Sequence, residues 1–308
     1  MKRTRRMNRT RLSPIDILGI TLGVIVILIV IGSVVTIARG RMFDARWSFV
    51  GRHAPWNGGG FSFGGPVREE RDEQVPSGAT EIEVRNVAGS IEISGSAGAA
   101  AIAVHSVKTA PFKAALDNVR VDIQKEGNRL IVAEKHDPGF LMRTGTVSFR
   151  VVVPRGMKVI DAHSVSGSIT VRGVEQGIDQ NLSTISGGIA TDMAGNLHAS
   201  STSGSIHFSS SGSTLNVRSV SGSIDGVIES LGTGGSAHLG TVSGSVTLDA
   251  FAGLDATVSL HSLSGRVSCS LPLTVSEQKN NRLNGKIGKG SANLDVGTVS
   301  GSISISKM

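Results

Sequence analysis

The chain has 308 residues, one cysteine and a formal net charge of +7. A single cysteine excludes an intrachain disulfide. The positive charge is concentrated near the start, because residues 1–52 carry +8, residues 53–78 carry −2 and residues 79–308 carry only +1. A nucleic-acid-binding surface needs clustered positive charge on the binding element, so no nucleic acid is expected as a partner of residues 79–308.

Residues 1–16 are a basic tail, and residues 17–38 are predicted to form a transmembrane helix. The segment Ile17–Ile37 has 21 residues and no charge, and as a helix it would be about 31 Å long, the thickness of a hydrocarbon core. Six basic residues precede it and four follow it within fifteen positions. This bias favours a cytoplasmic N-terminus. We therefore expect a single span in the cytoplasmic (inner) membrane and an extracytoplasmic C-terminal domain, in the periplasm or at the cell surface.

A cleavable signal peptide is the alternative interpretation of this segment, although its apolar region would normally have only about 7–15 residues. Residues 39–78 are predicted to be a flexible linker, rich in glycine and aromatic residues. Six of the eleven aromatic residues of the chain lie in it. Such rings suit the headgroup region of a bilayer, and a segment that docks onto another protein is the alternative.

A phrase of five residues, most often Val-Ser-Gly-Ser-Ile, occurs eight times between residues 165 and 303, with central glycines 16 to 22 residues apart. A ninth copy lies upstream at Val87–Ile91. A period near twenty is typical of solenoids, in which one unit cannot bury its own apolar face. Apolar residues recur in steps of two, the period of a β-strand. The fold class is therefore predicted to be all-β, a β-solenoid of about nine coils of roughly 20 residues.

Each coil is predicted to contain two short strands with a bend near the glycine. The glycine has the parity of the inward residues, so we expect a corner or a close backbone approach there, and the flanking serines are expected to point outward. The predicted repeat core comprises Val87, Gly89, Ile91, Val165, Gly167, Ile169, Ile185, Gly187, Ile189, Gly204, Ile206, Val220, Gly222, Ile224, Val242, Gly244, Val246, Leu263, Gly265, Val267, Leu283, Gly285, Ile287, Val299, Gly301 and Ile303.

We expect successive copies to stack directly on one another. Residues 157–308 are predicted to form the regular repeats, and residues 79–156 a less regular N-terminal part of the same domain. Ordinary strands are expected at 101–107, 119–124, 130–134 and 147–153, with a helical turn at 111–118.

No catalytic residue, cofactor or metal site is predicted. Glycosidase carboxylates lie about 5–9.5 Å apart, but the residues equivalent to Asp225 in other copies are not acidic: Thr170, Ala190, His207, Thr247 and Ser304. His163 and His261 share one offset from the glycine, and His198 and His238 share another, but neither pair falls in successive coils, so no shared metal is expected. Cys269 is expected at an outward or edge position.

The repeated phrase, the upstream copy at residues 82–93 and the strand before Pro154 together resemble the bacterial putative-adhesin family of β-strand repeat proteins, whose function is unknown. The resemblance covers roughly residues 79–308. It implies an exported or membrane-tethered β-solenoid with an adhesive role, and it supplies no catalytic motif. Here the repeat departs at Gly188, Arg266 and Asn284/Lys286, which interrupts the serine stripe.

The leading hypothesis is a non-enzymatic envelope protein whose solenoid contacts surface glycans or envelope proteins. A second hypothesis is an accessory or sensor of an envelope-stress regulatory system, in which the basic tail carries the specificity. A polysaccharide-acting β-helix enzyme and end-to-end polymerisation through open strand edges are further alternatives.

Overall fold

The computed structural model describes residues 65–76, 78–136, 145–251 and 253–308. The predicted tail, transmembrane helix and most of the linker, residues 1–64, lie outside these ranges. Among the described residues, no helix has the length and apolar character needed to cross a membrane.

The described part of the chain is almost entirely β-structure, which confirms the all-β class. Its one helix is α2 (Lys113–Asp117). The strands are β1 (Val67–Pro76), β2 (Glu81–Ala88), β3 (Ile91–Gly95), β4 (Ala101–Ala110), β5 (Val119–Glu126), β6 (Arg129–His136), β7 (Thr146–Val153), β8 (Val159–Ser166), β9 (Ile169–Arg172), β10 (Ile178–Ser186), β11 (Ile189–Ser203), β12 (Ile206–Ser210), β13 (Thr214–Ser221), β14 (Ile224–Ile228), β15 (Ser236–Ser243), β16 (Val246–Ala250), β17 (Ala256–Ser262), β18 (Val267–Cys269), β19 (Thr274–Lys279), β20 (Arg282–Ile287), β21 (Ala292–Ser300) and β22 (Ile303–Lys307).

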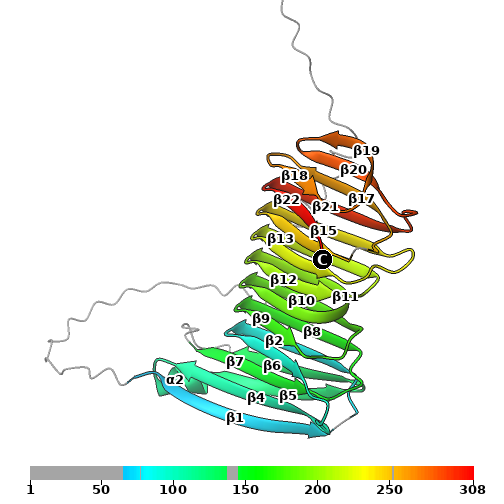
Figure 1. Ribbon diagram of the computed structural model, residues 1–308. Helices are drawn as coiled ribbons and strands as arrows, with labels where there is room; N and C mark the ends of the chain where they lie inside the picture. Colours follow the sequence, from blue (N-terminus) through cyan, green and yellow to red (C-terminus); the bar gives the residue numbers. More distant parts are fainter. Residues whose placement is uncertain (1–64, 77, 137–144, 252) are drawn as a thin grey trace, which may run out of the picture. The chain divides into compact units, whose positions relative to one another are not determined.

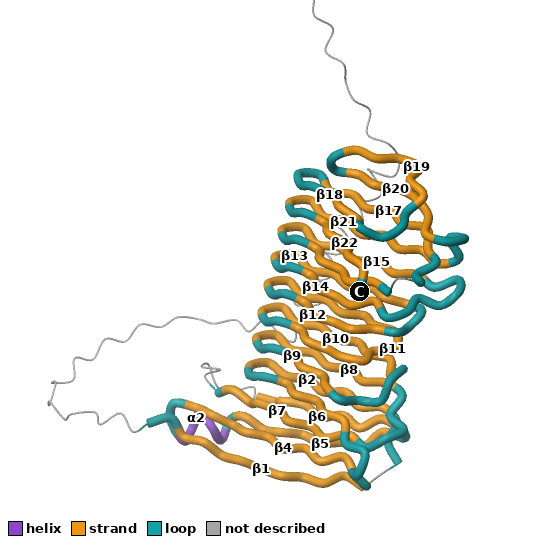
Figure 2. The backbone as a smooth tube through the Cα atoms, in the orientation of Figure 1, coloured by secondary structure: helices purple, strands orange, loops and turns teal. Residues whose placement is uncertain are grey.

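These strands form two layers of a stack, and most coils contribute one strand to each layer (Figures 1 and 2). The first layer runs in the order β5-β6-β2-β8-β10-β11-β13-β15-β21-β17-β20-β19. The second runs β1-β4-β7-β3-β9-β11-β12-β14-β16-β22-β18. The long strand β11 takes part in both layers, with Met193 between its two parts in a left-handed conformation (φ 51°).

Within a coil, every second residue points into a single apolar core. In β13, Leu215 and Val217 are fully buried, and in β14 so are Ile224 and Ile228. The coils pair in parallel and in register, for example Ile224 between Ile206 and Val246. Equivalent side chains therefore form columns along the stack, which explains why one coil alone could not bury its apolar face.

The N-terminal part follows the sequence-based expectation with one correction. Strands β4 to β7 and helix α2 lie where ordinary strands and a helical turn were expected, and β2–β3 form a true coil that pairs with β8 and β9. However, β1 falls within the predicted linker, residues 39–78, so the folded region begins before residue 79. Its charged residues pair with β4, as in Lys108–Glu69 (2.7 Å). Charged side chains are common on edge strands, where they discourage pairing with other chains.

A second correction concerns the order of stacking. The last copy of the phrase, in β21 and β22, does not follow the seventh copy in space but lies between β15–β16 and β17–β18. The seventh copy, Leu283–Ile287, does not turn a corner, because it forms the straight strand β20 of an antiparallel hairpin with β19. Leu283, Gly285 and Ile287 are buried there, but they belong to a cap and not to a coil.

Candidate functional site

The glycine of each coil lies at a corner where the backbones of neighbouring coils touch. A β-carbon added at Gly187, Gly204, Gly222 or Gly244 would overlap the carbonyl group of the glycine in the preceding coil, and one at Gly301 would overlap Gly244. Only a residue without a side chain can occupy these positions. The stacked glycines, called here the glycine column, therefore make the close backbone approach that the sequence predicts.

The residue two positions after the glycine is buried in the coils. Ile91, Ile169, Ile189, Ile206, Ile224, Val246 and Ile303 are at most 1% exposed. Val267 in β18 is only partly buried, because β18 pairs with a strand on one side alone. Cys269, in the same edge strand, packs partly buried against the core.

In the coils, the residue two positions before the glycine does not belong to the core, contrary to the sequence-based prediction. Val165, Val242, Leu263 and Val299 are 42%, 39%, 75% and 45% exposed, and Val87, Ile185 and Val220 are only partly buried. The inward–outward alternation of the strand places the residue just before each of these inside the stack. The apolar residue itself therefore turns outward at the corner.

In most coils, the inward position before the corner holds a hydroxyl residue that hydrogen-bonds to the glycine column. The hydroxyls of Thr184, Ser201, Ser219 and Thr241 donate to the carbonyl oxygens of Gly167, Gly187, Gly204 and Gly222 at 2.9–3.1 Å. Asn86, at the same position in the first coil, donates its side-chain amide to the carbonyl of Gly89 in its own coil. These polar side chains satisfy carbonyl groups that the corner would otherwise leave unpaired.

Replacing Thr241 with valine is expected to destabilise the protein by about 1–3 kcal/mol, because it leaves the partly buried Gly222 carbonyl without its partner. Urea unfolding of the purified protein measures the loss. Thr247→Val is the matched control, since Thr247 lies in the same coil but is exposed. Equal loss in the two variants would contradict the role assigned to the Thr241 hydroxyl.

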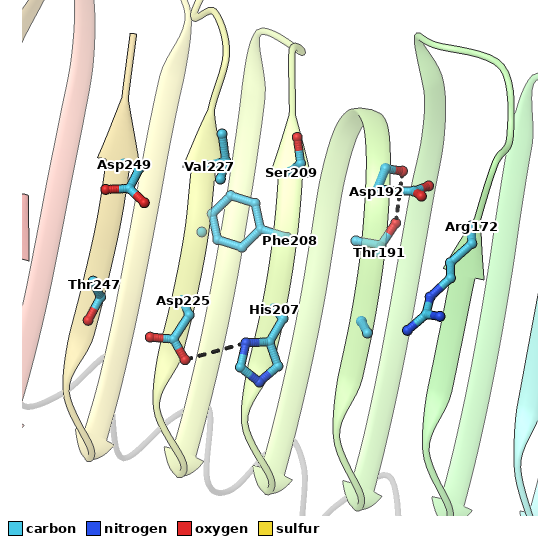
Figure 3. A pocket seen from close by; sticks show the side chains of 12 residues that line it. Arg172, Thr191, Asp192, His207, Phe208, Ser209, Asp225, Val227, Thr247 and Asp249 are labelled. Atoms are coloured by element: carbon cyan, nitrogen blue, oxygen red, sulfur yellow. Dashed lines mark hydrogen bonds and ion pairs between the residues drawn. The ribbon is translucent and has the colours of Figure 1, made fainter. Parts of the chain in front are cut away.

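The outer face of the second layer carries an open groove of about 380 Å³ across β9, β11, β12, β14 and β16 (Figure 3). Ala190, a small residue of its lining, lies in register between Thr170 of β9 and His207 of β12. Its charged lining consists of Arg172, Asp192, His207, Asp225 and Asp249.

Several of these side chains are held in place by neighbouring coils. Asp225 Oδ2 lies 3.4 Å from His207 Nδ1, and the Asp192 carboxylate accepts the amide hydrogen of Gly173 at 3.0 Å. Phe208 also borders the groove, but it is only 4% exposed. The groove therefore offers charges and hydrogen-bonding groups to a ligand, and no open aromatic face.

Sequence reasoning missed this groove because it compared acids only at equal offsets from the glycine. Asp225 lies three residues after its glycine, whereas Asp192 and Asp249 lie five after theirs. Asp225 and Asp249, on the adjacent strands β14 and β16, differ by two positions in register and are therefore diagonal neighbours on one face of the sheet. A search over diagonal offsets could have found the cluster.

A second polar cluster lies on the outer face of the first layer, centred on Arg129. Its guanidinium contacts Glu81 (3.2 Å), Glu83 (3.1 Å) and Asp161 (3.4 Å). Burial alone would raise the pKa of Glu83, but the hydrogen bond from Arg85 and the charge of Arg129 bring that pKa below its usual value. Since each carboxylate is already paired with Arg129, we interpret this cluster as a structural contact that joins β6, β2 and β8.

The histidines occupy positions that the chain order did not predict. His163 contacts Ser183 at 2.6 Å, and burial lowers the pKa of its imidazole. Because β21 is inserted between β15 and β17, Asp295 lies between His238 (3.6 Å) and His261 (3.8 Å). In the described part of the chain, no group of three or more His, Cys, Asp or Glu residues is suitably placed to hold a metal ion.

The stacked coils form two layers and are joined by columns of glycine and hydroxyl residues. This two-layered stack, called here the rack, defines a β-strand repeat protein. The family model described as Toastrack DUF4097 matches residues 74–306. The chain therefore belongs to this family, which confirms the resemblance to adhesin-like repeat proteins of unknown function.

Among solved structures, the chain is similar to a putative adhesin from Bacteroides fragilis, with 13% identity over 78% of this chain and 97% of that chain and a TM-score of 0.42. It is also similar to a putative cell adhesion protein from Clostridium sporogenes, with 10% identity over 79% and 100% of the chains and a TM-score of 0.34. A third, a putative adhesin from Parabacteroides merdae, has 12% identity over 79% and 96% and a TM-score of 0.30. No curated protein matches the chain.

Proposed function

We propose that this chain is a non-enzymatic, membrane-anchored envelope protein whose extracytoplasmic rack binds surface glycans through the groove of the second layer. The uncharged segment Ile17–Ile37 and its basic flanks support the anchor. The groove supports the binding role, because it combines a hollow with fixed hydrogen-bonding groups.

The single observation that carries the proposal is the shape and chemistry of this groove. It runs across five neighbouring strands, so a ligand lying along it would meet a new coil about every 4.8 Å. A linear polymer with repeated hydroxyl groups can use such a surface, because polar side chains from several coils line it. The outward serines beside most of the glycines extend the polar surface along the same stack.

The proposal is tested by binding of the purified full-length protein to a glycan array and to isolated cell-wall material. Filling the groove with Ala190→Trp, or removing its His207–Asp225 contact with the double variant His207→Ala/Asp225→Ala, is expected to abolish the binding seen with the unaltered chain. The matched control is His238→Ala/Asp295→Ala, which removes a similar exposed His–Asp contact from the other layer. Absence of binding by the unaltered chain, or equal loss in the control, would refute the groove as a glycan site.

A further inference from the structure

The coil formed by β21 and β22, called here the inserted coil (residues 292–307), occupies a slot between two coils that precede it in the chain (Figure 1). On one side β21 pairs with β15 and β22 with β16. On the other side β21 pairs with β17 and β22 with β18. Without the inserted coil, β15–β16 and β17–β18 would face each other with unpaired strand edges.

The inserted coil is bound by the same kinds of contact that join most other coils. Its inward residues Leu294, Val296 and Ile303 are at most 1% exposed. The Thr298 hydroxyl donates to the Gly244 carbonyl at 3.0 Å, and the Ser262 hydroxyl donates to the carbonyl of Gly301 at 2.8 Å. These contacts are set by the repeat, so a second copy of this chain could supply the coil with identical geometry.

The connection that brings the inserted coil into its slot is short. Ala256 at the start of β17 lies opposite Ile287 on one side and Ala292 on the other. Residues 288–291 must therefore cross over the start of β17 and span two strand spacings, about 9.6 Å. Gly288 and Gly290 both adopt the left-handed conformation, with φ of 62° and 75°.

Asp255 holds this crossing in place. Its carboxylate accepts the amide hydrogen of Gly290 at 2.6 Å and the hydroxyl of Ser291 at 2.8 Å. The Ser291 hydroxyl, together with the backbone amides of residues 289–291, keeps the pKa of Asp255 below its usual value. The crossing is thus a tight hinge whose geometry depends on two glycines and one carboxylate.

We propose that the inserted coil is exchanged between two copies of this chain, each copy donating residues 292–307 to the slot of the other. A short hinge held in a constrained conformation favours such exchange, because the hinge can straighten when the coil is donated. The coil-to-coil contacts are the same in the exchanged and unexchanged forms, so the exchange has a low cost.

Two single-cysteine variants test the exchange. Ser243 and Ser300 are exposed in-register partners of β15 and β21, and Cα atoms of adjacent strands are close enough for a disulfide. One chain carries Ser243→Cys and the other Ser300→Cys, both with Cys269→Ser to remove the native thiol. After co-expression and oxidation, a disulfide-linked dimer of the two variants is expected on a non-reducing gel.

The matched control uses Ser166→Cys and Ser186→Cys, which are partners in the middle of the stack and should give far less of the linked dimer. A short Gly-Ser insertion after Lys289 lengthens the hinge and is expected to reduce the Ser243–Ser300 dimer several-fold. A mixed dimer no more abundant than in the control, or one unaffected by the longer hinge, would overturn the proposal.

Discussion

Gly187→Ala is expected to destabilise the protein by about 3 kcal/mol or more, which is among the largest effects for so small a change. The added methyl group would overlap the carbonyl group of Gly167 in the preceding coil. That backbone cannot move away freely, because the Gly167 amide donates a hydrogen bond to Ser186 at 3.0 Å. Urea unfolding, followed by circular dichroism, measures the loss.

The adjacent glycine supplies the control. A β-carbon at Gly188 would lie 3.3 Å from the nearest atom, Ser205 O, and most other copies have serine at this position. Gly188→Ser should therefore change stability by no more than about 0.5 kcal/mol. If both variants unfold at the same urea concentration, the glycine column does not have the close backbone contact that the fold requires.

Ile224→Asp is expected to lower stability by more than about 4 kcal/mol, because it places an unpaired charge in the core. Ile224 is fully buried, and its in-register neighbours Ile206 and Val246 offer no polar partner. The midpoint of thermal unfolding should fall sharply. Ser223→Asp, one residue earlier and on the outward side of the corner, should melt close to the unaltered protein, and a similar fall in both would show that the inward face has been misassigned.

The columns of inward-facing side chains could be predicted from the sequence, because the apolar residues of each coil are spaced with the two-residue period of a β-strand. The alternation in β13 and β14, the corner at the glycine, and the upstream coil of β2 and β3 all follow from residues spaced in steps of two. The outward valines could not be recognised in the same way. Val220 is more apolar than Ser219, but the Gly204 carbonyl gives the serine hydroxyl a hydrogen-bond partner, so the less apolar residue is the one that turns inward.

The stacking order was beyond sequence reasoning for a related reason. Copies with nearly identical phrases can pair with one another in any order, so periodicity alone does not say that β21 pairs with β15 and β17. The groove depends on this kind of spatial information as well, because Asp192, Asp225 and Asp249 come from three different coils. The sequence predicts that the charged residues of β1 belong to the linker, because their edge position is visible only in the folded structure.

Disulfide formation between pairs of cysteines, placed at the outward serines that precede the corner glycines, tests the stacked arrangement most directly. With Cys269→Ser, single chains that carry both cysteines of an in-register pair should crosslink readily: 166 with 186, 186 with 203, and 221 with 243. A pair that skips one coil, 166 with 203, should not. Crosslinking of the skipped pair as readily as of the neighbouring pairs, or failure of the in-register pairs, would contradict a rack of coils joined at their glycine corners.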